Sequence, residues 1–391
     1  MATLLFHLGY IMRPLMVFVV LSVGVYGESG PRRASRSSVV HSTVGTACAP
    51  HLLEQSFGSR PRSFPVVDRA KAKAKELTAL TGGGEAGKRL SKSKSSTLKN
   101  KLIASRPWTW TAGIIPVLLT AALVHRAEGL DVNKAGLVNA LIMVTTLQSA
   151  GNMVNSAEDF KYGVDTFETA GDRTIVDGHI DPLGAYLLAG VLVVAAVAAV
   201  LPTIFGLRAA AAGGARDLEI TFWAGLAMVF SYSCWPLRLK YRGLGDITVF
   251  FLFGPMLMQV ASLMICGEAQ GWILPYGVPA ALLCEAILHA NNMRDIEQDR
   301  SAGITTFATM IGFRASQVHY GSMVLLAYVF AGVLALRRHR GSALAFVTLP
   351  LAAAAIKGCT PESIRSFKLD ETTAKLHMLF GVLMVAGTLI F

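Results

Sequence analysis

The stretch Asn291-Asn292-Met293-Arg294-Asp295-Ile296-Glu297-Gln298-Asp299 closes an apolar run that begins near residue 272. Within it, Asn291, Asp295 and Asp299 stand four residues apart. On a helix these three side chains lie on one face, about one turn from each other. Acidic side chains in a membrane segment are unfavourable unless they face a cavity and meet cations. The stretch therefore predicts a polar cavity at the end of a membrane-spanning helix.

A second stretch of the same kind, Asn155-Ser156-Ala157-Glu158-Asp159, closes an earlier apolar run near 136–157. Asn155 and Asp159 are again about one helical turn apart on one face. Two such clusters, four spans apart, suggest a duplicated half and one central cavity that both clusters face. Carboxylate and amide oxygens suit Mg²⁺, which takes oxygen ligands and is usually shared with substrate phosphates. The two stretches therefore predict a Mg²⁺ site shared with a phosphate-bearing ligand.

Basic residues accompany both clusters. Arg106 precedes the first apolar run, Arg173 and Lys240 lie in loops, and Arg294 lies inside the second cluster. Arginine offers a planar pair of donors to phosphate, and lysine offers a point charge. Acids for a metal ion, bases for phosphate and an apolar chamber together predict a lipid diphosphate as the ligand.

Apolar runs of roughly the length that crosses a bilayer recur from Trp108 onward. The nine predicted spans lie at about 108–125, 136–157, 183–203, 218–236, 246–266, 272–292, 316–336, 342–357 and 374–391. Of the 391 residues, 53% are hydrophobic and 16% are charged, against about a quarter charged in soluble proteins. The runs lack the alternation of barrel strands. The sequence therefore predicts an all-α polytopic membrane bundle of about nine transmembrane helices around a central cavity, and it argues against a soluble enzyme or a disordered chain.

The first hundred residues have a different character. Residues 12–25 form a short apolar run, and residues 28–101 hold 15 Lys and Arg against 5 Asp and Glu, within a formal net charge of +11. This pattern is typical of a signal or transit segment, and an additional anchor helix is the alternative. We therefore divide the chain into a targeting segment with a basic, disordered arm at 1–100 and a transmembrane catalytic domain at 101–391. The expected location is a eukaryotic organelle membrane: endoplasmic reticulum, Golgi, mitochondrion or plastid.

Three other sets of residues have both a structural and a functional interpretation. Glu285 is an acid inside the sixth run and is a candidate for acceptor binding or proton removal. The histidines at span ends are interpreted as interfacial residues rather than ligands: His125, His179, His289 and His377. The aromatic and methionine residues of the fifth run are interpreted as lipid-facing packing rather than an acceptor pocket: Phe250, Phe251, Phe253, Met256 and Met258.

The pattern Asn-x3-Asp followed by Asn-x3-Asp-x3-Asp across these apolar runs resembles the UbiA superfamily of intramembrane aromatic prenyltransferases. The resemblance covers about 105–391 and is sharpest with the branch that prenylates naphthoquinols in menaquinone (vitamin K) biosynthesis. The stretches that carry it are Arg106-Pro107-Trp108, Gly151-Asn152-Met153-Val154-Asn155, Gly171-Asp172-Arg173-Thr174-Ile175-Val176-Asp177, Lys240-Tyr241 with Gly245-Asp246, and Glu285-Ala286-Ile287-Leu288-His289-Ala290-Asn291-Asn292.

The resemblance implies a helix bundle in which Mg²⁺ joins two acidic motifs to a diphosphate, with Asp159, Asp295 and Asp299 as catalytic residues. The implied metal ligands are Asn155, Asp159, Asp165, Asn291, Asp295 and Asp299. The further implied substrate-binding residues are Arg106, Arg173, Lys240, Tyr241, Asn292 and Arg294. The implied reaction transfers a prenyl group, expected to be geranylgeranyl, from a polyprenyl diphosphate to menadiol or 1,4-dihydroxy-2-naphthoate.

Two alternatives remain at this point. The first is a different aromatic acceptor, such as 4-hydroxybenzoate, homogentisate or haem, although the branch-specific stretches favour a naphthoquinone. The second is a non-catalytic transporter or regulator, because intramembrane acids also line ion paths. A transporter would place its charges near the midplane on broken helices, whereas most of these acids stand at span ends on one side. A sterol-synthesis enzyme is a partner by resemblance only, and no nucleic-acid partner is expected.

Overall fold

The structure is a computed structural model that describes residues 98–127, 129–161, 173–211, 213–234 and 236–391. The targeting segment and nearly all of the arm predicted at 1–100 lie outside the described residues, as does Asp165. Within the described ranges every extended regular element is a helix, and one isolated backbone bridge joins Arg242 to Thr305. The predicted all-α class is therefore confirmed.

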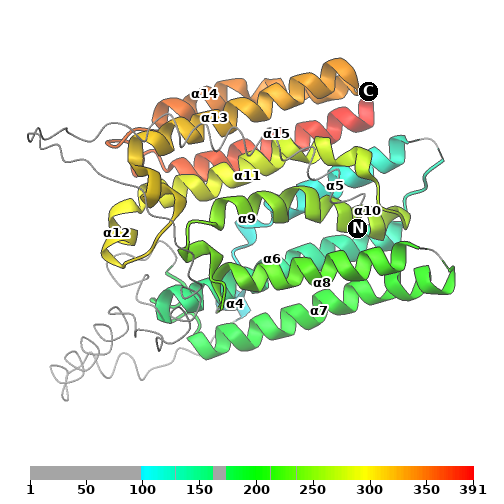
Figure 1. Ribbon diagram of the computed structural model, residues 1–391, viewed down its shortest axis with the longest axis horizontal. Coiled ribbons are helices and arrows are strands. Elements are labelled where there is room, and N and C mark those ends of the chain that lie inside the picture. Colours follow the sequence, from blue (N-terminus) through cyan, green and yellow to red (C-terminus); the bar gives the residue numbers. More distant parts are fainter. Residues whose placement is uncertain (1–97, 128, 162–172, 212, 235) are drawn as a thin grey trace, which may run out of the picture.

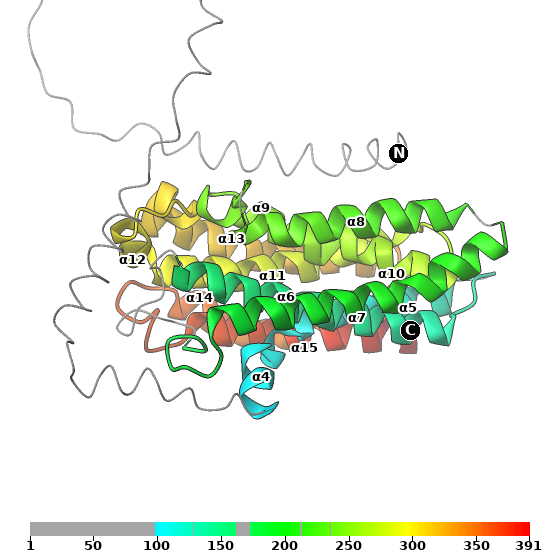
Figure 2. The same ribbon diagram turned by 90° about the horizontal axis from the view of Figure 1, so that it is seen from below.

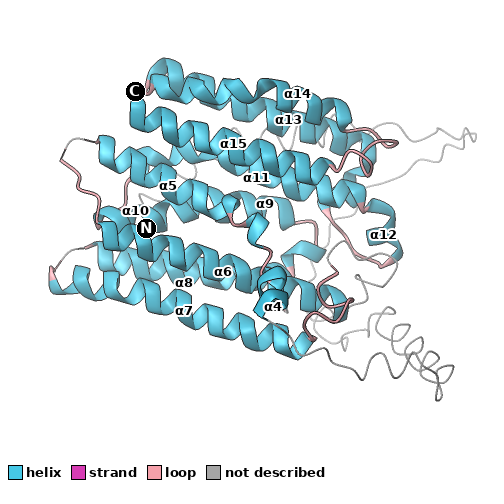
Figure 3. Ribbon diagram, turned by 180° about the vertical axis from the view of Figure 1, so that it is seen from behind, coloured by secondary structure: helices cyan, strands magenta, loops and turns pink. Residues whose placement is uncertain are grey.

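The helices are labelled as in Figure 1, with η for short 3-10 or π segments. In chain order they are α4 (Leu98–Ala104), η1 (Pro107–Thr109), α5 (Thr111–Arg126), α6 (Lys134–Lys161), α7 (Pro182–Ala209), α8 (Gly214–Ser233), η2 (Leu239–Tyr241), α9 (Gly245–Phe251), η3 (Leu252–Met256), α10 (Leu257–Cys266), η4 (Gly271–Ile273), α11 (Leu274–Arg294), α12 (Ile296–Ser301), α13 (Phe307–Arg337), η5 (Arg340–Thr348), α14 (Leu349–Gly358) and α15 (Leu369–Ile390). The long helices lie side by side along one common axis, as Figure 3 also shows from behind.

All nine apolar runs are mainly helical, but not all are equally suited to a membrane. Among the described residues, seven helices are long and apolar enough to cross a bilayer, and up to eight if the bent pair Asn100–Thr109 and Thr111–Arg126 forms one span. The helix at the fourth predicted run, α8, is not one of the seven, and it carries Arg216, Asp217 and Glu219 near its start. The protein is a multi-pass helical membrane protein.

The helix directions bring three chain segments to one end of the bundle. The C-terminal ends of α6 and α11 and the N-terminal end of α15 lie at the end that also carries α12 (Figures 1 and 2). Between the ends, α11 packs against α13 and α15 in one apolar core that includes Leu283, Tyr320 and Phe380. A second core joins α5, α6, α8 and α10 around Leu218 and Leu263. Both acidic motifs therefore sit at the same end of the bundle.

The fifth predicted span is broken between α9 and α10. Gly254 has φ −110° and ψ −106°, which are not helical values, and Pro255 follows it. Proline has no backbone N–H to donate and its ring disturbs the preceding turn, so that a helix bends or widens at this point. The break alters the directions of the side chains of η3 relative to a continuous helix.

Close contacts between helices depend on glycine at several positions. A Cβ atom added at Gly387 on α15 would lie 2.0 Å from the carbonyl oxygen of Gly341, and one added at Gly136 on α6 would lie 1.9 Å from that of Met264. Small residues let helix backbones approach closely in a membrane, where packing replaces the hydrophobic effect as the force between helices. Glycine at these positions therefore sets the spacing of the bundle.

We expect Gly387→Ala to destabilise the protein in detergent by about 1–3 kcal/mol, because the added methyl group overlaps the Gly341 carbonyl. Gly190→Ala on α7 is the matched control, since nothing lies within 4 Å of a Cβ atom added there. Thermal unfolding followed by circular dichroism would measure the difference. Equal midpoints for the two variants would contradict the close contact.

Candidate active site

A cavity of about 530 Å³ lies among α5, α6, α8, the α9–α10 segment, α11 and α15. Its volume is in the range of about 300–1,000 Å³ that is usual for ligand sites. The polar end holds Asn155, Asp159, Lys240, Asn291, Arg294, Asp295, Asp299 and Asp370. The apolar part, further along the same helices, is lined by Met143, Leu147, Phe222, Leu226, Phe253 and Leu257. The cavity therefore offers charged groups at one end and hydrocarbon surface beyond them.

The first predicted cluster forms a hydrogen-bonded group with η2. Lys240 Nζ donates to Asp159 Oδ2 at 2.6 Å and to Asn155 Oδ1 at 3.0 Å. The Tyr241 hydroxyl donates to Asp159 Oδ1 at 2.6 Å, and Asn155 Nδ2 donates to Asp159 Oδ2 at 3.1 Å. Burial and the Asp159 charge raise the pKa of Tyr241, so that its hydroxyl remains a donor. Three donors therefore converge on the Asp159 carboxylate and fix its position.

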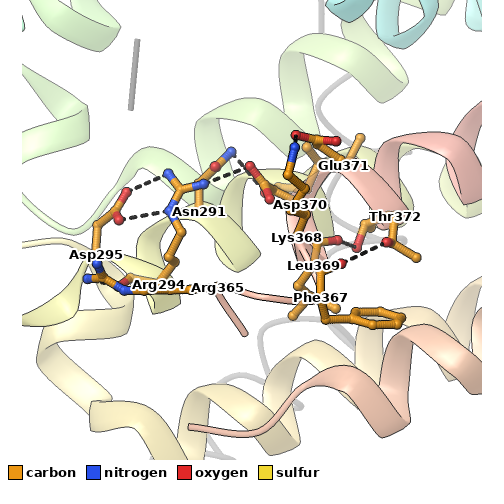
Figure 4. Close-up of polar contacts among 12 residues, drawn as sticks. Asn291, Arg294, Asp295, Arg365, Phe367, Lys368, Leu369, Asp370, Glu371 and Thr372 are labelled. Atoms are coloured by element: carbon orange, nitrogen blue, oxygen red, sulfur yellow. Dashed lines mark hydrogen bonds and ion pairs between the residues drawn. The ribbon is translucent and has the colours of Figure 1, made fainter. Parts of the chain in front are cut away.

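Arg294 connects the second predicted cluster to α15 (Figure 4). Its Nε and Nη2 atoms donate to the two carboxylate oxygens of Asp295 at 2.9 and 2.7 Å, and its Nη1 atom donates to Asp370 at 2.8 Å. Asn291 lies one turn before Asp295, and its Nδ2 atom donates to the Ile287 carbonyl at 3.3 Å. The planar guanidinium thus fixes two carboxylates from different helices at the polar end of the cavity.

Asp299 is the most weakly compensated acid of this end. Its side chain accepts a long hydrogen bond, of 3.4 Å, from Thr306 Oγ1. Burial raises the pKa of Asp299 to about 7, the Asp295 and Asp159 charges act in the same direction, and Lys240 opposes them. Carboxylates that share one site repel one another, so that an additional cation is stabilised among them.

Arg106 lines the cavity and has a strained backbone conformation. Its φ of 52° and ψ of 60° are left-handed values, which are uncommon for residues other than glycine. Amide groups of α6 hold the flanking residues: Gln148 Nε2 donates to the Thr109 carbonyl at 2.6 Å, and Asn152 Nδ2 donates to Thr109 Oγ1 at 3.0 Å. Arg106 Nη2 donates to Ser156 Oγ at 3.0 Å. Three successive turns of α6 therefore position this arginine.

The structure brings together most of the predicted site residues. Those that line the cavity are Arg106, Asn155, Asp159, Lys240, Asn291, Asn292, Arg294, Asp295 and Asp299. Tyr241 joins them through Asp159. Arg173 is not among the lining residues in the described part of the chain, and its Nη2 atom lies 2.7 Å from Asp177. The Asp177 carboxylate raises the pKa of Arg173 by its hydrogen bond and its charge.

Sequence reasoning missed three polar residues at this end. Asp370 binds Arg294, Ser233 Oγ donates to Asn155 Oδ1 at 2.9 Å, and Thr306 donates to Asp299. Asp370 stands just before the last apolar run, at a span end like the other site acids. That position in the sequence could have identified it as a site residue. Ser233 and Thr306 carried no comparable signal, because single hydroxyl residues are common at helix ends.

The interpretation of His289 and His377 as interfacial residues was wrong, because both side chains are buried inside the bundle. His289 Nδ1 lies 2.8 Å from Asp246 Oδ1. Glu285, the candidate for acceptor binding, lies 3.6 Å from His319 Nε2 and is not among the cavity-lining residues that the structure describes. These groups form buried polar contacts between α9, α11 and α13.

The interpretation of the fifth run as lipid-facing packing was also wrong at four positions. Phe253 and Met256 line the cavity, and Phe250 and Met258 are buried. The physical reason is the position of the α9–α10 segment inside the bundle, where it packs against α5, α6, α8 and α11 and leaves little of its surface for lipid.

The donor chemistry of the polar end fits Mg²⁺. Within the described ranges no three His, Cys, Asp or Glu side chains converge closely enough to hold a metal ion by themselves. Mg²⁺ is usually bound through one or two carboxylates together with substrate phosphates and water. Asp159 on one side and Asp295 and Asp299 on the other face the same cavity. The residues therefore fit an ion shared with an anionic ligand rather than a closed protein cage.

The protein is a helical membrane bundle whose cavity has acid–base pairs at one end and an apolar part beyond them. Such a cavity is typical of the class of membrane proteins that bind a ligand with a charged head and a hydrocarbon tail. The sequence profile of the UbiA prenyltransferase family matches residues 113–360. The chain belongs to the UbiA prenyltransferase family, and it is a prenyltransferase.

Curated relatives support this membership. UbiA prenyltransferase domain-containing protein 1 of Gallus gallus is 34% identical over 294 residues, which are 74% of this chain and 84% of that protein. The protein of the same name from Homo sapiens is 33% identical over 294 residues, with 74% and 83% covered. The Drosophila melanogaster homologue is 34% identical over 292 residues, with 74% and 79% covered.

Solved structures show the same fold. An apo UbiA homologue from Aeropyrum pernix K1 has a TM-score of 0.54 at 18% identity, over 71% of this chain and 96% of that chain. A UbiA homologue from Archaeoglobus fulgidus bound to DMAPP and Mg²⁺ has a TM-score of 0.51 at 14% identity, over 73% and 99%. The predicted UbiA-type bundle is therefore confirmed.

We expect Asp370→Asn to lower the rate of prenyl transfer about ten- to a hundredfold, because Arg294 loses a charged partner that fixes its orientation. Glu297→Gln is the matched control, since the Glu297 side chain is 84% exposed on α12 and pairs with Arg300. Steady-state rates of the purified variants, with thermal midpoints to establish folding, would measure the effect. A folded Asp370→Asn protein with the parental rate would contradict this role.

Proposed function

We propose that this prenyltransferase transfers a prenyl group from a polyprenyl diphosphate to a naphthoquinol in menaquinone biosynthesis. The proposed prenyl group is geranylgeranyl, and the proposed cofactor is Mg²⁺. The observation that carries the proposal is the cavity, with its acid–base pairs at one end and its apolar part beyond them. The A. fulgidus homologue was solved with DMAPP and Mg²⁺ bound, which supports a prenyl diphosphate and a divalent ion as the ligands here.

The diphosphate would occupy the polar end. Lys240 and Arg294 pair with Asp159 and Asp295. Phosphate oxygens would compete for these bases, which would release carboxylate oxygens for metal binding. Asn155, Asp159, Asn291, Asp295 and Asp299 are the residues proposed to hold Mg²⁺, with Asp165 of the sequence motif. Mg²⁺ would neutralise charge that develops on the departing diphosphate.

The reaction begins when the bond between the prenyl C1 atom and the diphosphate oxygen breaks, and the electron pair leaves with the diphosphate. Lys240 and Arg294 stabilise the leaving group, because ionised donors bind the fully charged product more strongly than the ester. The apolar walls of the cavity exclude water, so that the allylic cation is not hydrolysed.

An electron-rich ring carbon of the acceptor then forms the new carbon–carbon bond. The ring loses a proton, or carbon dioxide if the acceptor is 1,4-dihydroxy-2-naphthoate. A naphthoquinol is proposed because the branch-specific stretches at 151–155 and 285–292 belong to α6 and α11, two helices of the cavity wall. The segment at 1–100 is proposed to direct the protein to an organelle membrane, where a sterol-synthesis enzyme is a proposed partner.

We expect Asp159→Asn and Asp295→Asn each to reduce turnover by at least about 10²-fold without unfolding the bundle, because each removes a charge needed at the diphosphate end. Glu297→Gln, an exposed carboxylate of the same region, should keep the parental rate. Product formation measured by mass spectrometry, together with thermal midpoints, would test this. Parental rates in both folded variants would exclude the proposed site.

Removal of divalent ions should abolish turnover reversibly. We expect EDTA to stop prenyl transfer and added Mg²⁺ to restore it, because the carboxylates alone repel the diphosphate. Full activity after exhaustive chelation would show that Lys240, Arg294 and Arg106 suffice to bind the donor.

The acceptor is tested with purified protein in detergent, Mg²⁺ and geranylgeranyl diphosphate. Menadiol, 1,4-dihydroxy-2-naphthoate and 4-hydroxybenzoate are offered separately. We expect prenylated menadiol or naphthoate as the product. Product from 4-hydroxybenzoate alone would assign a different acceptor class, and a folded protein without product from any of them would favour a transporter or regulator.

A further inference from the structure

The apolar part of the cavity has a measurable length along three of its walls. On α6, lining residues extend from Asn155 back to Met143, and on α8 they extend back to Thr221 from the Ser233 contact with Asn155. Twelve helical residues on each wall correspond to about 18 Å. The α9–α10 wall extends from Val249 to Val260, in agreement with the other two.

This length corresponds to several isoprene units. Each unit adds four carbon–carbon bonds to the chain, about 5 Å when extended, given bonds of about 1.5 Å. A chain of two units whose diphosphate lies at the polar end would therefore end near the middle of the apolar part. A chain of four units would extend along its whole length.

Gly225 lies in the middle of that path. It lines the cavity from α8, eight residues before Ser233, which places it about 12 Å from the polar end. Met256 of η3 packs directly against it, since a Cβ atom added at Gly225 would lie only 3.2 Å from the Met256 Sδ atom. Both residues line the cavity, so a larger side chain at Gly225 must either enter the cavity or displace Met256.

The neighbouring residues of the cavity wall differ from Gly225. Phe222 and Leu226 also line the apolar part, but their bulky side chains already form its wall. Gly151 lines the cavity from α6, yet a Cβ atom there would meet Val229 of α8 rather than Met256. Gly225 is thus the position at which a new side chain would press on Met256 and reduce the width of the cavity.

We propose that Gly225 is a specificity-determining residue: because it has no side chain, Met256 packs against it and the cavity beside this pair stays wide enough for prenyl chains longer than about two isoprene units. The inference rests on the proposed function, because it assumes that the diphosphate occupies the polar end. A side chain at this position would leave room for a short chain and block the distal part of a long one.

The test uses Gly225→Leu with geranyl, farnesyl and geranylgeranyl diphosphates and menadiol as acceptor. We expect the ratio kcat/KM for geranylgeranyl diphosphate to fall about ten- to a hundredfold, since overpacking is strongly unfavourable. The value for geranyl diphosphate should stay within about threefold of the parental value, because the short chain ends before the obstruction. Gly190→Leu is the matched control, since nothing lies within 4 Å of a Cβ atom added there on α7.

A second substitution separates obstruction from general damage. Met256→Ala in the Gly225→Leu background should restore use of geranylgeranyl diphosphate, because the leucine can then occupy the space of the Met256 side chain instead of narrowing the cavity. If Gly225→Leu does not fold, Gly225→Ala should show a smaller chain-length effect in the same direction. An equal loss with all three donors, or no loss with the longest, would overturn the role of Gly225. A parental protein that uses none of the donors would instead overturn the proposed function.

Discussion

Charged side chains inside a membrane bundle must meet opposite charges, because transfer of an isolated ion into a medium of low polarity is strongly unfavourable. At the polar end of the cavity Lys240 meets Asp159, and Arg294 meets Asp295 and Asp370. These pairs therefore tie α6, η2, α11 and α15 to one another at one end of the bundle.

The same constraint divides the cavity into two chemically different parts. The charged residues that line the cavity lie where the ends of α6 and α11 meet the start of α15, and hydrocarbon side chains line the space beyond. Figure 1 shows these helix ends side by side. A strained residue such as Arg106 persists only where its surroundings hold it, and the amide groups of α6 supply those contacts. Helix α6 thus carries the first acidic cluster and also holds Arg106 beside the same cavity.

Local regularities of the sequence determined much of this architecture. The lengths of the apolar runs predicted a helical membrane bundle, because a bilayer requires paired backbone groups over a fixed span. The spacing of Asn155 from Asp159, and of Asn291 from Asp295, predicted two polar faces at helix ends, since helical periodicity depends on neighbours in the chain alone. Arg173 shows the limit of such reasoning, because proximity to a motif in sequence did not bring it to the cavity.

Only the tertiary structure decided which groups meet. Lys240 reaches Asp159 across 81 residues of sequence and Arg294 reaches Asp370 across 76, and no periodic pattern specifies such pairs. The fifth run was predicted to face lipid, but packing of its helices against α5, α6, α8 and α11 places Met256 at the cavity. The sequence by itself determined the helices and their polar faces, whereas helix neighbours, ion-pair partners and the shape of the cavity depend on packing between segments far apart in the chain.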